Sequence, residues 1–143
     1  MVKMVDVSPK VATNRVAEAE GIILLQEDTI AKIENHEVEK GDVQSVAELM
    51  GIQGAKLTSQ IMPLCHPLPI ESVQVHFEVL PEGVKITTRV EANAKTGVEM
   101  EALTAVTVAL LNVWDMVKMY EKDADGQYPS AQITGVKVNY KQK

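Results

Sequence analysis

Apolar and polar side chains alternate along four segments of the chain, and this alternation predicts four strands. Residues 16–25 run from an alternating pattern into a solid apolar stretch, which favours a strand and leaves a helix as the alternative. Residues 71–80 and 84–92 alternate on either side of the turn sequence "PEG" and predict a β-hairpin with one polar face. Residues 131–143 predict a closing strand, in which Gly135 marks a bulge.

A period of three to four residues predicts helices between these strands. Residues 27–35 form a candidate for a short helix. Asp42 is expected to cap a second helix, which Gly51 and Gly54 then end or kink. A further short helix is expected to run to about residue 62, where a proline stops it.

The longest periodic segment, residues 95–123, predicts a single long helix, and Thr96 is placed to cap its N-terminus. The resulting order is strand, helices, hairpin, long helix, strand. It predicts an α+β two-layer sandwich of ferredoxin-like type, in which about four mostly antiparallel strands carry helices on one face. The length of 143 residues suits one domain covering residues 1–143.

Charge and composition limit which kinds of molecule the protein is expected to bind and in which cellular compartment it is expected to lie. The formal net charge is −6 and only 3% of residues are aromatic, so binding to nucleic acid is not expected. A small anionic ligand would need a local cluster of lysines or arginines. The chain has no uncharged apolar run of about 18 residues, so no transmembrane helix is expected. A single cysteine and an N-terminal segment without an apolar signal core favour the cytoplasm.

The sequence "PLCHPLP" places the only cysteine, Cys65, beside His66 and between Pro63 and Pro67. In isolation such a pair is a small buried cysteine and a histidine with satisfied hydrogen bonds. The prolines restrict the backbone on both sides, however, and a stiff loop before a strand suits a polar group that is held against a ligand. Zinc binding is not expected without a second cysteine, and the sequence does not show the base and electropositive setting that a cysteine nucleophile needs.

The sequence "KTGVEMEAL" begins the long helix with Glu99, Met100 and Glu101, shortly after Lys95. Acidic residues are favourable in the first turn of a helix. This preference explains the presence of one glutamate here better than the presence of two. A helix N-terminus beside a lysine also favours an anionic ligand. Both interpretations remain open from the residues alone.

Asp115 and Lys118 lie three residues apart near the end of the same helix, so they can pair on one face. A surface ion pair is the plain interpretation. Because Asp115 follows a largely apolar stretch, a buried pair with a shifted pKa is the functional alternative, and such pairs serve as acid–base groups. Lys40, just before the cap of the second predicted helix, is by itself a solvated lysine.

Glu101 and Asp115 are 14 residues apart, which puts them on one face of a helix but roughly 21 Å apart along its axis. Within one chain, a small ligand cannot bring its reacting part to both carboxylates. If both serve the same chemistry, an antiparallel second chain has to bring its own Glu101 towards Asp115. The spacing therefore predicts a symmetric dimer with an interfacial site.

Six segments occur in an order and at spacings that resemble one family: "MVDVS", "KGDV", "MGIQGAKLT", "PLCHPL", "KTGVEMEALTAVTVALLNVWDMVK" and "EKD". The family is that of the cyclic pyranopterin monophosphate synthases, the C protein of molybdenum cofactor biosynthesis. The resemblance runs from Met4 to about Val138, and "KTGVEMEALTA" together with "PLCHP" is highly specific for it.

The resemblance implies an enzyme that converts (8S)-3′,8-cyclo-7,8-dihydroguanosine 5′-triphosphate to cyclic pyranopterin monophosphate with loss of pyrophosphate. It also implies an α+β fold and a homohexamer, a trimer of dimers, with the site between subunits. The implied partner is this small nucleotide, and neither nucleic acid nor a membrane. No cofactor is required by the pattern, although Mg²⁺ could assist with the pyrophosphate.

Residue by residue, the resemblance places the catalytic aspartate at Asp115 and the essential lysine at Lys118. The implied substrate-binding residues are Leu64, Cys65, His66, Glu99, Met100, Glu101 and Lys40, with Lys56 and Lys122 as further phosphate contacts. Carboxylates, a histidine and lysines suit a reaction with several proton transfers and a triphosphate substrate. In this assignment His66 faces the substrate and Cys65 forms a wall of the pocket.

The resemblance departs at the C-terminal end. Many relatives carry a tail of the form "KSGGKSG" where this sequence reads "VNYKQK", and Lys141 is expected at the place of the first tail lysine, with Lys143 as a stand-in for the second. Two alternatives from other classes are a non-catalytic nucleotide-binding α+β module and a structural subunit of a larger complex. The first predicts binding without turnover, and the second predicts no nucleotide binding.

Overall fold

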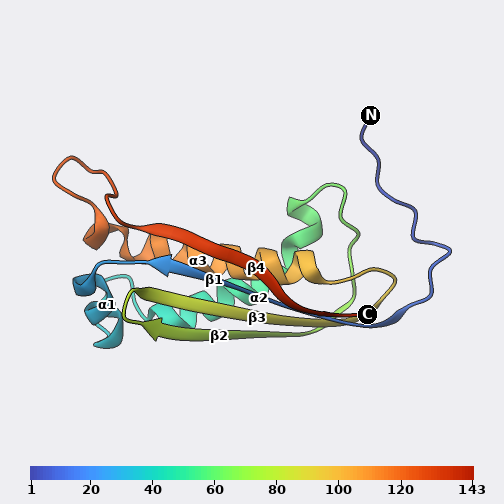
Figure 1. Ribbon diagram of the computed structural model, residues 1–143, viewed down its shortest axis with the longest axis horizontal. Helices are drawn as coiled ribbons and strands as arrows, with labels where there is room; N and C mark the ends of the chain where they lie inside the picture. Colours follow the sequence, from blue (N-terminus) through green and yellow to red (C-terminus); the bar gives the residue numbers. More distant parts are fainter.

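The computed structural model describes residues 1–143 and contains four strands and three helices (Figure 1). In chain order these elements are β1 (Thr13–Leu24), α1 (Glu27–Glu34), α2 (Val43–Ile61), β2 (Ile70–Leu80), β3 (Gly83–Ala94), α3 (Glu99–Glu121) and β4 (Gln132–Gln142). All four predicted strands and the short helix predicted at residues 27–35 are confirmed. The segment at residues 16–25, for which a helix was the alternative, lies in a strand as far as residue 24.

The four strands form one antiparallel sheet in the order β2-β3-β1-β4. β1 and β2 are consecutive strands of the sequence, yet β3 lies between them, which is the split arrangement of a ferredoxin-like fold. β2 and β3 form the predicted hairpin. The α+β two-layer prediction is confirmed, because the helices α2 and α3 cover one face of this sheet (Figure 1).

The core lies between the two central strands and α3. The inward positions of β3, Val84, Ile86, Thr88 and Val90, have no exposed surface. Thr88 satisfies its hydroxyl by donating to the carbonyl oxygen of Ala102 in α3, at 2.7 Å. By length and composition α3 could cross a membrane, but 56% of its apolar window is buried inside the protein, as in a core helix.

α2 is one continuous helix, so the prediction that Gly51 and Gly54 end or kink it is wrong, and so is the prediction of a separate short helix after them. The two glycines are buried instead because α2 lies very close to its neighbours. A Cβ on Gly54 would meet the Val108 side chain and would lie 3.3 Å from the Cα of Ala105 in α3. The absent side chain therefore permits close helix–helix packing, and the helix continues to the predicted stop before the proline at residue 63.

The start of α3 also differs from the prediction. The N-cap residue is Val98, and no side chain caps the helix, so Thr96 does not have the expected role. The carboxylate of Glu99 folds back over Gly97, where a Cβ would collide with it. Acidic side chains of the first turn, Glu99 and Glu101, thus occupy the positive end of the helix in place of a threonine hydroxyl.

The predicted bulge in β4 is confirmed at Gly135. Its φ angle is +67°, and the pairing of β4 with β1 shifts register between Glu20 and Ile22. Within the bulge, Val136 packs over Gly21 of β1, on the side of the sheet that faces α3. The last residues of this edge strand reach the beginning of α3, where Lys141 contacts Glu99.

The close packing at Gly54 gives a test of the fold. The substitution Gly54→Ala is expected to lower the free energy of unfolding by about 1–3 kcal/mol, because the new methyl group overlaps Val108 in a packed core. The measurement is chemical denaturation at a fixed protein concentration. Gln53→Ala, at the neighbouring exposed position, is the matched control and is expected to change stability by less than about 0.5 kcal/mol. A stabilising Gly54→Ala would contradict the close approach of α2 and α3.

Candidate active site

Three charged side chains meet near the C-terminal end of α3, and we call them the Asp115 cluster: Lys40, Asp115 and Lys118. Lys118 Nζ lies 3.1 Å from Oδ1 of Asp115, one helical turn away. Lys40 Nζ comes from the loop between α1 and α2 and lies 3.3 Å from Oδ2 of Asp115. It also donates to the carbonyl oxygen of Asp115 at 2.9 Å. Each carboxylate oxygen of Asp115 therefore faces one lysine.

This arrangement lowers the pKa of Asp115. The hydrogen bond from Lys118 is the largest cause, and the hydrogen bond from Lys40 is the next. Asp115 is 56% exposed, so the expectation of a buried pair is wrong for the single chain. The physical reason is that residue 115 projects away from the core side of α3, and ion pairing rather than burial shifts its pKa. The result is a carboxylate that stays ionised next to two ammonium groups.

The loop that carries Lys40 has a defined conformation. Asp42 caps α2 as predicted, because its carboxylate accepts the backbone N–H of Ser45 at 3.0 Å. The same carboxylate contacts Nδ1 of His36 at 3.2 Å. Gly41 has a φ angle of +123°, a conformation that residues with a side chain rarely adopt, and it directly follows Lys40. The turn after Lys40 is therefore specified by a glycine and a helix cap.

An open pocket of about 520 Å³ lies beside the Asp115 cluster. It is lined by Leu111, Trp114, Asp115 and Lys118 of α3 and by Ile133 of β4. Its wall is mostly apolar, with the aspartate and the lysine as polar groups. A pocket of this kind suits a ligand with a flat apolar ring system and an ionic part.

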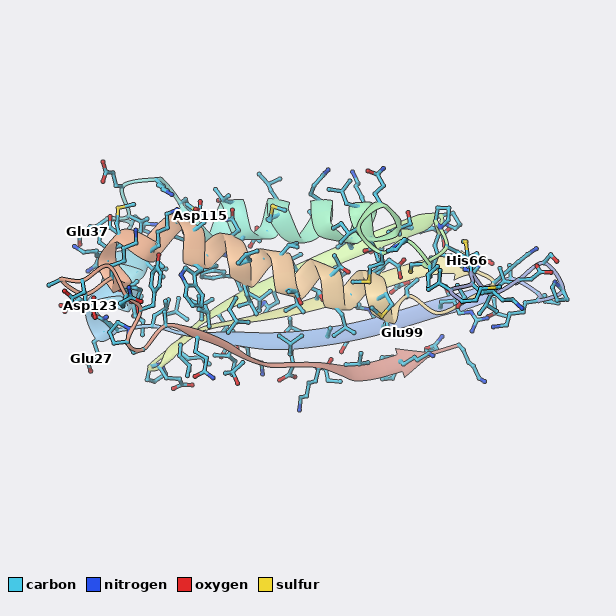
Figure 2. The ribbon with its side chains drawn as sticks, turned by 90° about the horizontal axis from the view of Figure 1, so that it is seen from above. Glu27, Glu37, His66, Glu99, Asp115 and Asp123 are labelled. Carbon is cyan, nitrogen blue, oxygen red and sulfur yellow. The ribbon has the colours of Figure 1, made fainter.

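A second group of candidate residues lies at the opposite end of the molecule, and we call it the His66 cluster: Cys65, His66, Glu99 and Glu101. Figure 2 shows His66 and Glu99 at one end of the protein and Asp115 at the other. His66 lines a pocket of about 410 Å³ together with Lys95 from the segment before α3. Both side chains also contribute a little to the lowered pKa of Asp6, whose main cause is a hydrogen bond from Ser8. The segment "MVDVS" thus lies at this end as well.

Glu101 is the most deeply buried carboxylate of the His66 cluster, with 2% of its surface exposed. Burial raises its pKa, and the negative charge of Glu99 adds to this effect. One oxygen of each glutamate is buried without a hydrogen-bond partner within the chain. Lys141 of β4 contacts the other oxygen of Glu99 at 3.3 Å, which brings the expected C-terminal lysine into the cluster. A buried carboxyl oxygen without a partner is suited to accept a proton from a ligand or, when protonated, to donate one to it.

Cys65 is partly buried in the loop before β2. Burial raises the pKa of its thiol, and the charges of Glu101 and Glu99 raise it further. A thiol with a raised pKa is a poor nucleophile at neutral pH, because the thiolate is the reactive form. This supports the prediction that Cys65 forms a wall of the pocket.

The remaining predicted residues are less tightly placed. Leu64 and Met100 are exposed beside the His66 cluster, at 48% and 36%. Lys122 is the C-cap residue of α3, one turn beyond Lys118, and Lys56 is exposed on α2; neither makes an ion pair within the chain. The chain has no group of three or more histidine, cysteine, aspartate or glutamate side chains that could hold a metal ion.

Sequence reasoning missed two aromatic residues near the Asp115 cluster. Trp114 lines the adjacent pocket, and Tyr120 contacts the Lys40 loop through its hydroxyl. The chain has only one tryptophan, one phenylalanine and three tyrosines. Two of these five aromatic residues lie within five positions of Asp115, and this concentration was an available signal.

Known proteins resemble this chain over nearly its whole length. The MoaC family matches residues 4–143. A protein of Sulfurisphaera tokodaii named "Probable cyclic pyranopterin monophosphate synthase" is 53% identical over 136 residues, 95% of this chain and 90% of its own. A protein of Aeropyrum pernix with the same name is 51% identical over 140 residues, 98% of this chain and 96% of its own. A Methanothermobacter thermautotrophicus protein named "Probable cyclic pyranopterin monophosphate synthase accessory protein" is 49% identical over 142 residues, 99% of this chain and 89% of its own. The chain belongs to the MoaC family.

Proposed function

We propose that this protein converts (8S)-3′,8-cyclo-7,8-dihydroguanosine 5′-triphosphate to cyclic pyranopterin monophosphate and releases pyrophosphate, as a lyase of molybdenum cofactor biosynthesis. The observation that carries the proposal is the Asp115 cluster, an aspartate held between two lysines, in a chain that the MoaC family matches over residues 4–143. The names of the relatives support the same reaction.

In this proposal the Asp115 cluster handles protons and phosphate charge. An ionised Asp115 can accept a proton from the substrate, and Lys118 beside it can donate one. Closing the cyclic phosphate forms one bond between oxygen and the α-phosphorus and breaks the bond from that phosphorus to pyrophosphate. Lys40 and Lys118 would offset the charge that develops on the leaving pyrophosphate, and Lys122 and Lys56 are further candidates for its oxygens.

The His66 cluster supplies a second set of acid–base groups. His66 has a ring nitrogen for a proton transfer, and the buried Glu101, with its raised pKa, can hold a proton at higher pH than an exposed glutamate. Opening a purine ring and rebuilding it as a pterin requires several such transfers. Leu64, Cys65 and Met100 would shape the surface around the ring.

We propose further that one active site combines the two clusters from two chains. The clusters lie at opposite ends of α3 (Figure 2), and a helix of this length separates them by roughly 20 Å or more. An antiparallel copy related by a two-fold axis would bring its His66 cluster to the Asp115 cluster. Exposed apolar side chains on the two long helices support an interface there: Val46, Leu49, Ile61, Met100, Leu111 and Met119.

The proposed assembly is a homohexamer built as a trimer of such dimers, in the cytoplasm. Its proposed partner is the small nucleotide substrate. We do not propose that it binds nucleic acid or a membrane. The rival function is that of a nucleotide-binding module without turnover. The name of one relative, which ends in "accessory protein", is the observation that favours this rival. The rival predicts that substitutions at Asp115 leave the function intact.

The first prediction about the proposed function concerns Lys118→Ala. This variant is expected to lower the rate of product formation by at least about 100-fold, because it removes a proton donor beside Asp115. Substrate is still expected to bind. Single turnover is followed by pyrophosphate release and by fluorescence of the oxidised pterin. Binding is followed by the fluorescence of Trp114, the only tryptophan, which lines the same pocket. Lys137→Ala on β4 is the control for the loss of an exposed lysine.

If the wild-type protein binds the nucleotide but forms no product, the binding-module alternative holds. If Lys118→Ala turns over at the wild-type rate, the lysine has no role in the chemistry. Loss of both binding and turnover in Lys118→Ala would show that Lys118 is needed for substrate binding and would contradict the expected result.

The second prediction separates the two neighbours in "PLCHPLP". Cys65→Ser is expected to keep most of the activity, because the thiol has a raised pKa and serves as a wall. His66→Ala is expected to lose activity by about 100-fold, since a general acid–base group is removed. Initial rates under saturating substrate measure both. The reverse pattern would show that Cys65 is the reacting group.

The third prediction tests whether the site is shared between chains. Asp115→Ala and Glu101→Gln are each expected to be inactive alone. Chains of the two variants that are unfolded together and refolded form mixed dimers, in which one of the two sites has both residues intact. Random pairing then restores about a quarter of the wild-type activity. A mixture that stays inactive, while refolded wild type regains activity, would place each complete site within one chain.

A further inference from the structure

Tyr120 connects the end of α3 to the loop that carries Lys40. The backbone N–H of Glu39, the residue before Lys40, donates to the hydroxyl oxygen of Tyr120 at 2.9 Å. Over the face of the ring, Lys32 of α1 places its Nζ 5.1 Å from the ring centroid, a cation–π contact. The aromatic ring is thus held from α1, and its hydroxyl holds the loop.

The neighbouring Glu121 fixes the other end of α1 to the same turn of α3. Its side chain is fully buried. One carboxylate oxygen accepts the backbone N–H of Gln26 at 3.0 Å and the hydroxyl of Thr29, both at the start of α1. The last turn of α3 therefore holds α1 at its beginning through Glu121 and holds the following loop through Tyr120. The loop has little freedom to move away from α3.

Lys40 needs this restraint because its own side chain is long and partly exposed. The Lys40 side chain is 38% exposed, and the position of the loop backbone decides whether its ammonium group reaches Asp115. An exposed lysine loses rotamer entropy when it is held in one geometry, so an unrestrained loop would weaken its contact with Asp115. The turn after Lys40 is set by Gly41, and Val38 earlier in the loop is buried in the core. Apart from the bonds of Lys40 itself, the hydrogen bond of Glu39 to Tyr120 is the one that joins this loop to α3.

We propose that Tyr120 is a positioning residue that holds Lys40 against Asp115 by accepting the Glu39 amide hydrogen bond. Tyr120 does not touch the substrate in this role. Its effect on the reaction passes through the position of one lysine. The proposal rests on the proposed function, since it assumes that Lys40 acts in the active site.

Tyr120→Phe isolates this role. Phenylalanine keeps the ring, its packing and the cation–π contact with Lys32, and it removes only the acceptor for the Glu39 amide. Tyr140→Phe is the matched control, because its hydroxyl donates to Gln142 within β4, away from Lys40. The control is expected to leave activity unchanged.

The experiment uses the full-length protein in four forms: wild type, Tyr120→Phe, Lys40→Met and the double variant. kcat and KM are measured with the cyclic dihydroguanosine triphosphate, and its dissociation constant is measured by calorimetry. Lys40→Met is expected to change one of these three constants (kcat, KM or the dissociation constant) strongly. Tyr120→Phe is expected to change the same constant by about three- to tenfold. In the Lys40→Met background, Tyr120→Phe is expected to have no further effect. The dissociation constant allows this comparison even if Lys40→Met has no turnover.

Hydrogen exchange without substrate tests the contact itself. The amide of Glu39 is expected to exchange at least about threefold faster in Tyr120→Phe than in wild type, measured on a peptide covering residues 36–43. If exchange accelerates but the wild-type protein has no turnover, the proposed function fails while the restraint stands. Unchanged exchange in Tyr120→Phe, kinetic constants equal to those of wild type, or effects that add to those of Lys40→Met would each overturn the positioning role.

Discussion

The burial of α3 between the sheet and α2 is the constraint on which the rest of this structure depends. The helix has 23 residues, and its core side packs without exposed surface against the central strands. Gly54 removes the side chain that would keep α2 away, so both helices fit on one face of the sheet. Because α3 cannot bend or shift without opening the core, the residues at its two ends have a fixed separation.

That separation shapes the chemistry available to one chain. The Asp115 cluster and the His66 cluster are each incomplete as a set of acid–base and anion-binding groups, and the rigid helix keeps them apart (Figure 2). A fold with two half-sites at opposite ends is suited to an antiparallel pairing of two chains. In such a pair the Asp115 cluster of one chain lies beside the His66 cluster of the other. The proposed dimer follows from this geometry together with the exposed apolar residues on the helices.

The two ends of α3 shift carboxylate pKa values in opposite directions by different physical means. At the exposed end, two lysines lower the pKa of Asp115. At the buried end, desolvation and a neighbouring glutamate raise the pKa of Glu101. A pair of carboxylates with separated pKa values can act as base and acid at one pH. One helix therefore carries both kinds of group without needing a strained backbone.

The sequence by itself determined the four strands, α1, the long α3, their order and the fold class, because hydrophobic periodicity is a local property. The candidate residues of both clusters came from the resemblance to a known family. The glycines of α2 and the cap of α3 were misjudged, since a local rule treats glycine as a helix breaker and threonine as a cap. Only the tertiary structure decided that Gly54 faces α3 and that Glu99 covers the helix start. It also decided that Asp115 is exposed and that Lys40, 75 positions away, reaches it. Contacts between distant residues depend on how the elements pack, and no periodicity along the chain encodes them.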